Sequence, residues 1–477
     1  MRHQYATPWI WIFLLPLALD YKATNATTGH FAQFIFVVPA VATGLALLLI
    51  APRFHERSRL RSIVTANMLL CVFGSVVAQL VQDNDSGNYL RVLLPFVLFL
   101  LGYLVACRPW SEQRIAQFEK ALFAGNVISL VFTFVYGIAT GGGLEDVRFR
   151  IISVTLLGLQ GVLLHEFVVA KRYSLNTVAV FAGTVIVELL SVTRSLLVGT
   201  VLLFLIAMAL SAPSVRQIWR AIARGVVVAA VLTGVAGIAI LAVPNVAEHW
   251  TQRIFFSEAT VSGKDPTTIT RLAEMRDQYD QVTSNPETLL FGAGYGHYYR
   301  YSPAYLPDLA GQFSKQDFYA INEWAAGHNF WVYQFFAGGL VFGIAMPLGA
   351  LALCFFSYRY WRKVVPDAPM LPVLGRAIML FAALPATSIG GNPLGPRFSG
   401  LVFGIGLGLM IATYTRLQRA LPARTNRIRA ARRMRPAVMP DLPGRIQPGM
   451  GHSDLASTLG MSHTPRLPGA NQADIAR

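Results

Sequence analysis

Long apolar runs recur along this chain, and they constrain its fold more than any other feature. Most of them are about 17–25 residues long, enough for a helix to cross roughly 30 Å of hydrocarbon. Hydrophobic residues make up 54% of the 477 residues and charged residues only 13%, a composition unlike that of a soluble domain. We therefore expect an all-α polytopic membrane protein. The runs are Trp9–Leu19, Phe31–Ala51, Ser62–Val81, Tyr89–Cys107, Ala121–Thr140, Ile151–Ala170, Thr177–Thr193, Ser195–Leu210, Gly225–Val243, Phe330–Phe356, Leu371–Ile389 and Ser399–Tyr414.

The runs predict about 12 transmembrane helices around one long segment without an apolar run. Residues 1–243 would hold helices 1–9, residues 244–329 a large loop, residues 330–415 helices 10–12, and residues 416–477 a basic tail. The first run also fits a signal peptide, but Leu17-Ala-Leu19 is a poor cleavage site, so we expect a helix. The tail is rich in Arg, Pro and Gly without periodicity. We expect it to be disordered and to rest on anionic membrane lipid.

The distribution of basic residues predicts the orientation. Connections after the second, fourth, sixth, eighth and tenth runs carry Lys and Arg, for example Arg108, Arg114 and Lys120, whereas the intervening connections carry few. The positive-inside rule then places both termini in the cytoplasm and the large loop on the opposite side. The formal net charge of +16 is thereby explained by membrane orientation, and we expect no nucleic-acid partner.

The large loop is acidic, with 6 Lys and Arg against 10 Asp and Glu. Arg271 opens a predicted amphipathic helix over Arg271–Ser284. A guanidinium at a helix N-terminus is unfavourable, because the positive end of the helix dipole lies there. A bound phosphate would make it favourable, because the guanidinium and the backbone N–H groups could both bind the phosphate. The alternative is an ordinary surface pair with Glu274 or Asp277. Both interpretations remain open.

His328 and Asn329 stand where the loop enters the next apolar run. Asn329 is a good N-cap residue for that helix. An imidazole at a helix N-terminus is driven towards its neutral form, which can accept a proton, so His328 is a candidate general base. The alternative is a polar interfacial residue that contacts water.

Arg194 and Gly294 are two further candidates. Arg194 lies between two predicted spans, at a depth where a charged group is costly unless it faces protein, water or an anion. The alternative is an arginine that reaches the lipid headgroups. Gly294 lies in Gly292-Ala-Gly-Tyr-Gly296, which lacks the strand–helix context of a phosphate-binding loop. A tight turn near the membrane is the favoured interpretation, and Gly294 is kept as a candidate substrate contact.

The sequence suggests neither a metal nor a cofactor. All three cysteines lie in or beside apolar runs, and the large loop has none and no Asp-x-Asp motif. A cysteine-based metal site is therefore not expected. His165-Glu166 and Glu188 lie within or near predicted spans, where they could relay protons or pack helices together.

Four sequence features in order resemble those of the O-antigen ligase and O-antigen polymerase superfamily of bacterial inner membranes. Leu190-Ser-Val-Thr-Arg-Ser-Leu196 is similar to the family's arginine turn, and Arg271 precedes an amphipathic helix. Asn285-Pro-Glu-Thr-Leu-Leu-Phe-Gly-Ala-Gly-Tyr-Gly296 resembles the family's Pro…Gly-x-Gly stretch. His328-Asn-Phe-Trp-Val-Tyr-Gln-Phe-Phe-Ala-Gly-Gly-Leu340 resembles its His-Asn signature. The resemblance covers residues 178–346, and its specificity lies in the order of the motifs around one large loop.

The resemblance implies a metal-independent glycosyltransferase at the periplasmic face of the bacterial inner membrane. The donor would be a glycan linked to undecaprenyl diphosphate, and the acceptor lipid A-core or another glycan acceptor. Arg194 and Arg271 would bind the diphosphate, and His328 would assist the acceptor hydroxyl. The family often has Trp soon after the loop arginine where this chain has Met275-Arg276, so Arg276 is a rival to Arg271. Asn329, Gly294 and Arg397 complete the candidate substrate-binding residues.

Other functions share parts of this pattern. An O-antigen or exopolysaccharide polymerase and a protein O-oligosaccharyltransferase would use the same donor and topology, and the sequence does not separate them from a ligase. A polysaccharide transporter or flippase would suit about twelve helices, but it would show two related halves with interrupted helices at matching positions. A scaffold without catalysis would not bring Arg194, Arg271 and His328 together.

Overall fold

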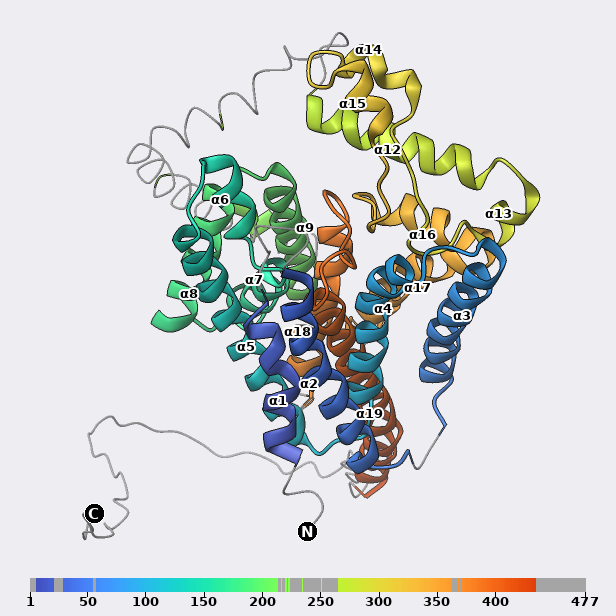
Figure 1. The fold of residues 1–477 in the computed structure, drawn as a ribbon. Coiled ribbons are helices and arrows are strands. Elements are labelled where there is room, and N and C mark those ends of the chain that lie inside the picture. The colour runs from blue at the N-terminus through green and yellow to red at the C-terminus, as the bar shows by residue number, and fades with distance from the viewer. Residues whose placement is uncertain are drawn as a thin grey trace, which may run out of the picture. The chain divides into compact units, whose positions relative to one another are not determined.

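The computed structural model describes residues 6–20, 29–54, 57–212, 265–362 and 370–434, with isolated positions between 216 and 250 and Ala368. Most of these residues are helical (Figure 1), and within them the only β pairing is a single antiparallel bridge between Tyr299 and Glu323. The chain divides into two compact units, Met1–Ala423 and Arg424–Arg477. Most of the second unit lies outside the described residues. So do the predicted span Gly225–Val243, except Gly234, and the loop residues before 265, except Trp250.

The helices before residue 212 are joined by short connections. Ser and Asp residues cap several of them, and Ser174 forms a capping box with Thr177 at the start of α8. The bounds are α1 Ala6–Ala18, α2 Gly29–Ile50, α3 Arg59–Gln82, α4 Ser86–Ala106, α5 Glu112–Ala139, α6 Leu144–Arg150, α7 Leu156–Leu164, the π-helix η1 His165–Val169, α8 Leu175–Leu190 and α9 Arg194–Ser211.

The helices after residue 264 comprise the described part of the large loop and the last apolar segments. Their bounds are α12 Pro266–Val282, α13 Pro286–Phe291, the 3-10 helix η2 Pro303–Tyr305, α14 Leu306–Leu309, α15 Lys315–Ala320, α16 Phe330–Gly338, the π-helix η3 Gly339–Gly343, α17 Ala345–Trp361, α18 Leu371–Thr387 and α19 Ser399–Met434. α19 runs well past the predicted end at Tyr414, because Arg, Ala and Leu are strong helix formers.

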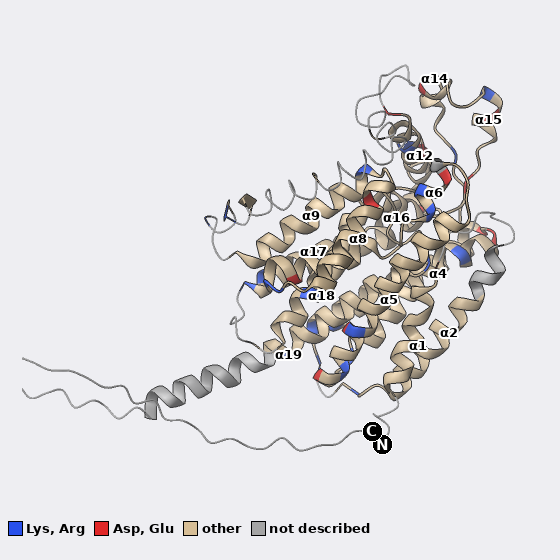
Figure 2. Cartoon of the chain, turned by 90° about the vertical axis from the view of Figure 1, so that its left-hand side faces the viewer, with Lys and Arg blue, Asp and Glu red and all other residues tan. Residues whose placement is uncertain are grey.

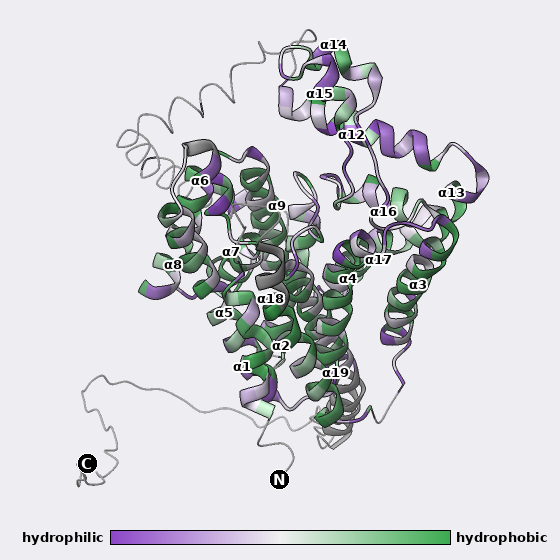
Figure 3. Ribbon diagram, viewed as in Figure 1, coloured by the Kyte–Doolittle hydropathy of each residue, from purple (hydrophilic) through white to green (hydrophobic). Residues whose placement is uncertain are grey.

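Several described helices have the length and composition of membrane spans. Five qualify alone, and a bent pair raises the number to six; five shorter apolar helices accompany them. Figure 3 shows the bundle helices mostly green, and Figure 2 shows them tan over most of their length. The five are α3, α4, α5, α9 and residues Ser399–Gln418 of α19. These apolar helices indicate a membrane protein, whereas the number of twelve spans stays a prediction.

The predicted single span Phe330–Phe356 is instead a bent pair of helices. α16 with η3 and the following α17 are bent by 84°. The bend lies between Gly343 and Ala345. The α-helical part ends earlier, before Gly339, which has a φ of 61° that L side chains rarely adopt. Apolar composition alone conceals this bend, because both arms are apolar.

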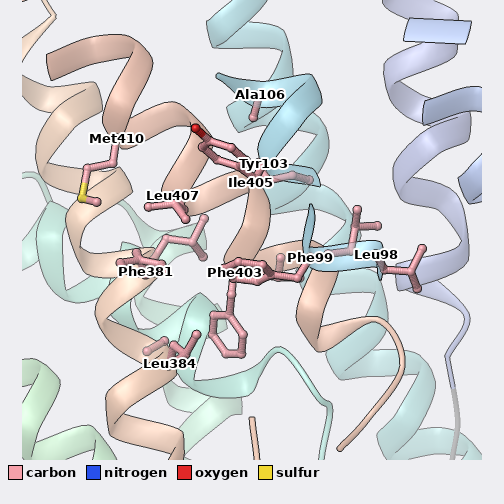
Figure 4. Close-up of a cluster of buried hydrophobic side chains, with 14 of the residues drawn as sticks. Leu98, Phe99, Tyr103, Ala106, Phe381, Leu384, Phe403, Ile405, Leu407 and Met410 are labelled. Atoms are coloured by element: carbon pink, nitrogen blue, oxygen red, sulfur yellow. The ribbon is translucent and has the colours of Figure 1, made fainter. Parts of the chain in front are cut away.

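The core of the bundle lies where α4, α18 and α19 meet. Figure 4 shows Phe99 and Tyr103 of α4 with Phe381 of α18 and Phe403 of α19 in one buried cluster. The helices α4 and α19 approach closely because glycines recur every four residues in α19. A Cβ at Gly400, Gly404 or Gly408 would meet α4, at Pro95, Phe99 and Ala106 respectively. The packed helices support the candidate site at one of their ends.

Candidate functional site

His328 and Glu274 form the hydrogen-bonded centre of the candidate site. Glu274 lies on α12, on the side that packs against α16, and is 2% exposed. Its Oε2 lies 2.7 Å from Nδ1 of His328, and its Oε1 accepts a hydrogen bond from the backbone N–H of His328, also at 2.7 Å. Gln278, one turn later, donates its side-chain amide to the same Oε1 at 3.2 Å. The carboxylate therefore fixes both the backbone and the ring of His328.

These contacts determine which imidazole nitrogen is available as a base. A carboxylate accepts hydrogen bonds, so Nδ1 carries the proton, and Nε2 holds the lone pair in the neutral ring. The side chain is 61% exposed, which leaves Nε2 at its open edge. The pKa of His328 is raised above its ordinary value, chiefly by the hydrogen bond to Glu274, against the opposing effects of burial and Arg271. The expected preference for a neutral ring at the helix N-terminus is thus outweighed by the carboxylate.

Arg271 contributes a half-buried cation beside this pair. Within the described part of the chain, no hydrogen bond or ion pair holds its guanidinium. The pKa of Arg271 is lowered, first by burial and also by Arg194, while Glu274 and Asp265 oppose the shift. A half-buried guanidinium without a bonded partner binds an anion favourably, because the anion compensates for lost hydration.

The helix that carries Arg271 begins earlier than the sequence pattern predicts. α12 starts at Pro266, and the side chain of Asp265 caps it by accepting from the backbone N–H of Thr268 at 3.0 Å. Arg271 is therefore in the second turn of α12. The prediction that its guanidinium lies beside the free N–H groups of the helix N-terminus is wrong. Pro at the first helical position and Asp before it are the local signals for this start.

Arg194 reaches the same place from a different helix. It is the first residue of α9, and its Nη2 lies 2.8 Å from Oδ2 of Asp265, with its side chain 41% exposed. Asp265 therefore both caps α12 and joins it to α9. Because Arg194 and Asp265 both shift the pKa of Arg271, and Arg271 shifts that of His328, the structure brings the three predicted residues together.

Asn329 confirms the predicted helix cap. Its Oδ1 accepts from the backbone N–H groups of Trp331 and Val332, each at 3.0 Å. The indole N–H of Trp331 donates to Oγ of Ser388 at 3.0 Å, which fastens the start of α16 to the end of α18. Asn329 thus positions the neighbouring His328 through the backbone.

Arg276 and Arg397 have other partners. Nε of Arg276 donates to Asp280 at 3.0 Å, and its side chain is 57% exposed. Arg276 follows Arg271 by five positions, which places the two about 140° apart around α12. Arg397, between α18 and α19, lies 3.9 Å from a carboxylate oxygen of Asp20. Neither arginine is among the charges that shift the pKa of Arg271 or His328.

Gly294 belongs to a tight turn, as the favoured interpretation predicted. The φ angles of Gly292, Gly294 and Gly296 are 85°, 90° and 77°. The backbone N–H groups of Ala293 and Gly294 donate to carbonyls at the end of α16, at 2.8 and 3.1 Å. The turn therefore caps the broken helix. The nine residues of α16 separate it from His328 by about 13 Å at the helical rise.

A polar groove of about 410 Å³ lies further along α12. Gln281, which lines it, is seven residues after Glu274, so about 10 Å of helix separates the two. Amide, hydroxyl and carboxylate side chains supply donors and acceptors suited to a hydroxyl-rich ligand. The lining residues are Gln82, Asp280, Gln281, Ser284, Asn285, Thr288, Ala293 and His297.

The sequence analysis missed Glu274 and Asp265 as members of the site. Glu274 was considered only as a surface partner of Arg271, yet it is buried and bonded to His328. Glu274 is spaced four residues from Gln278 on the face that also buries Ile269 and Ala273, but this local spacing does not show what that face packs against. No protein-family model and no curated protein matches this chain. The resemblance of the motifs therefore remains the basis for any assignment.

Proposed function

We propose that this chain is an O-antigen ligase-like glycosyltransferase that moves a glycan from undecaprenyl diphosphate to lipid A-core or a similar acceptor. The half-buried guanidinium of Arg271, which has no bonded partner among the described residues, carries the proposal, because it lies beside Arg194 and the accessible edge of His328. Two guanidiniums next to a base suit a reaction in which an alcohol displaces a diphosphate.

The proposed reaction is a displacement at the anomeric carbon of the donor sugar. Nε2 of His328 accepts the proton of the acceptor hydroxyl as its oxygen bonds to that carbon. The bond from the carbon to the diphosphate oxygen breaks, and undecaprenyl diphosphate leaves with the bonding electrons. Arg271 and Arg194 stabilise the charge that develops on the diphosphate, which requires forked hydrogen-bond donors rather than a metal.

Glu274 acts as the positioning residue. Its contact with Nδ1 keeps the proton on that nitrogen and turns Nε2 outwards, as a carboxylate does for the histidine of a catalytic triad. It also raises the pKa of His328, which makes the ring a stronger proton acceptor. The polar groove beyond Gln281 offers hydroxyl-compatible contacts for the glycan.

The proposed setting is the bacterial inner membrane, with about twelve spans, both termini in the cytoplasm and the loop in the periplasm. A transporter with the same topology would need two interrupted helices at corresponding positions. Among the described residues there is one bent pair, α16 with η3 and α17.

Complementation tests the proposal. The gene, or its His328→Ala variant, is expressed in a strain whose own ligase is deleted, and lipopolysaccharide is profiled by electrophoresis. We expect the wild type to restore long glycan on lipid A-core, and the variant to leave bare core with accumulated lipid-linked polymer. Restoration only in a polymerase-deleted strain, whose product stops at one repeat unit, would reassign the chain as a polymerase. Restoration in neither strain would contradict both.

A further inference from the structure

A buried carboxyl group lies close to the turn that carries Arg194. Glu188, near the end of α8, is 1% exposed, and it makes no ion pair with any described residue. Its two oxygens contact Gln160 of α7 and Thr200 of α9. An ionised carboxylate among apolar helices is costly unless cations or enough hydrogen-bond donors surround it. The protonation state of Glu188 therefore depends on what these two neighbours can donate.

Glu188, Gln160 and Thr200 form a closed ring of three short contacts. Nε2 of Gln160 lies 2.8 Å from Oε2 of Glu188, and Oγ1 of Thr200 lies 2.6 Å from Oε1 of Gln160 and 2.9 Å from Oε1 of Glu188. Three contacts need three hydrogen atoms. The amide supplies one, because its other contact in the ring uses its oxygen, and the hydroxyl has only one. The third must therefore be on the carboxyl of Glu188, and exchanging the amide oxygen and nitrogen leaves this count unchanged.

The turn between α8 and α9 has a strained backbone. Val192 has a φ of 50°, which a β-branched residue rarely adopts. Its side chain is buried against Trp250, whose indole N–H donates to the carbonyl of Leu189 at 2.8 Å. Such strain persists only where the surrounding contacts hold it. Arg194 begins α9 two residues after Val192, so relaxation of the turn would move its guanidinium.

The hydrogen-bonded ring joins the two sides of this turn. Glu188 precedes Arg194 by six positions, and Thr200 follows it by six. α7, which carries Gln160, packs against both α8 and α9 (Figure 1). Loss of one member would leave a buried polar group without a partner, which is unfavourable. The ring therefore opposes separation of the two helices that the strained turn connects.

We propose that Glu188 is a neutral carboxylic acid that closes this ring and is thereby a positioning residue for Arg194. The inference rests on the proposed function, in which Arg194 binds the diphosphate. A displaced guanidinium would stabilise the leaving group less, since a shift of about 1 Å costs up to roughly 10²-fold in rate. The alternative use of such a carboxyl is a proton relay, which would require Glu188 to ionise.

Infrared spectroscopy of the purified full chain tests the protonation state. In an ester-free detergent at about pH 8, ordinary carboxyl groups are ionised. The wild type should show the C=O stretch of a carboxylic acid, which should shift in D2O and be absent from Glu188→Gln. This measurement needs no glycan transfer, so it is independent of the proposed function. A difference spectrum between wild type and variant without this band would overturn the proposal.

Transfer by Glu188→Gln tests whether a neutral side chain is sufficient. Its amide can accept from Gln160 and donate to Thr200, so all three contacts of the ring are kept. The variant should keep the Tm of the wild type and a transfer rate within a few-fold of it. Lost transfer at an unchanged Tm would overturn the proposal, because it would show that an ionisable carboxyl is required.

Two substitutions of Thr200 test the positioning of Arg194. Thr200→Ser keeps the hydroxyl, whereas Thr200→Val removes it at nearly the same shape. Thr200→Val should have a lower Tm, and below that temperature its initial rate of transfer should fall by about 10–10²-fold. Thr200→Ser should stay within a few-fold of the wild type. Equal transfer rates for the two folded variants would overturn the positioning role.

Discussion

At the scale of single residues, the Glu274 carboxylate determines what His328 can do. It is 2% exposed and bonds both the backbone N–H and Nδ1 of His328 at 2.7 Å. A buried carboxylate is retained at such a position only if its hydrogen bonds compensate for its lost hydration. The contact therefore orients the imidazole and sets its basicity together.

The pH profile of transfer tests this coupling. Only the neutral ring accepts a proton, so activity should fall as the pH drops through the raised pKa of His328. Glu274→Gln removes the charge that raises this pKa, so the acidic limb should move to lower pH, and the plateau rate should also fall. The measurement is initial rate against pH, with Glu287→Gln, an exposed change on α13 outside the groove lining, as control. An acidic limb that stays in place in Glu274→Gln would refute the coupling.

Substitution of Arg271 or Arg194 should reduce transfer far more than substitution of Arg276. Arg271→Ala and Arg194→Ala should each reduce transfer by about 10²–10³-fold, the usual loss for one donor to a developing anion. Lysine should restore only part, because an ammonium lacks the forked geometry. Arg276→Ala should stay within a few-fold of wild type, since an exposed ion pair contributes about 0–1 kcal/mol. The measurement is the initial rate of transfer by each variant. An active Arg271→Ala together with an inactive Arg276→Ala would show that Arg276, not Arg271, binds the diphosphate.

The sequence predicts the role of a residue when that role depends on its immediate neighbours in the chain. Asn329 was predictable as a cap because its role depends on the adjacent helix start. Glu274 was not, because its burial arises from the packing of α12 on α16, 54 residues away in the chain. For the same reason the sequence left open whether Arg271 pairs at the surface.

At the scale of elements, the break after α16 shapes the region around the site. The glycine turn at Gly292–Gly296 supplies N–H groups to carbonyls that the break leaves without helical partners. The sequence predicted the turn and the apolar segment separately. The contact between the turn and the apolar segment was not predictable, because it depends on two backbones that approach closely. A Cβ at Gly339 would lie 2.5 Å from the carbonyl oxygen of Leu290.

Gly339→Ala should therefore destabilise the protein. Its φ of 61° costs a residue with a Cβ about 1–2 kcal/mol, and the contact with Leu290 adds to that. Thermal unfolding in detergent should show a lower Tm than wild type. Gly391→Ala is the matched control, since a Cβ there meets nothing within 4 Å, and its Tm should be unchanged. Equal Tm values for both variants would show that the glycine break is not required.

At the scale of the whole molecule, composition sufficed to predict helices and membrane character, and the described residues agree with that prediction. The number of spans and their orientation depend on the lipid and on charge placement, and stay predictions. Several apolar helices have 17 or fewer residues, as in α1 and α18, so apolar length alone does not establish which of them cross the bilayer.

Two matched cysteines test the orientation. In a background without Cys71, Cys107 and Cys354, Gln316→Cys on α15 should react with an impermeant thiol reagent in cells with a permeable outer membrane. Gln113→Cys on α5 should react only after lysis. Both positions are exposed, so the difference reports the side of the membrane. Reaction of Gln113→Cys alone in intact cells would invert the topology.

The most direct measurement of the central claim is glycan transfer by the purified full chain in excess EDTA, with saturating undecaprenyl-diphosphate-linked glycan and acceptor. The wild type should transfer glycan, because two guanidiniums and a base require no metal. His328→Ala should lose about 10²–10⁴-fold in rate, the usual contribution of a general base, while its Tm stays that of the wild type. Transfer by folded His328→Ala at nearly the wild-type rate would contradict the proposed mechanism.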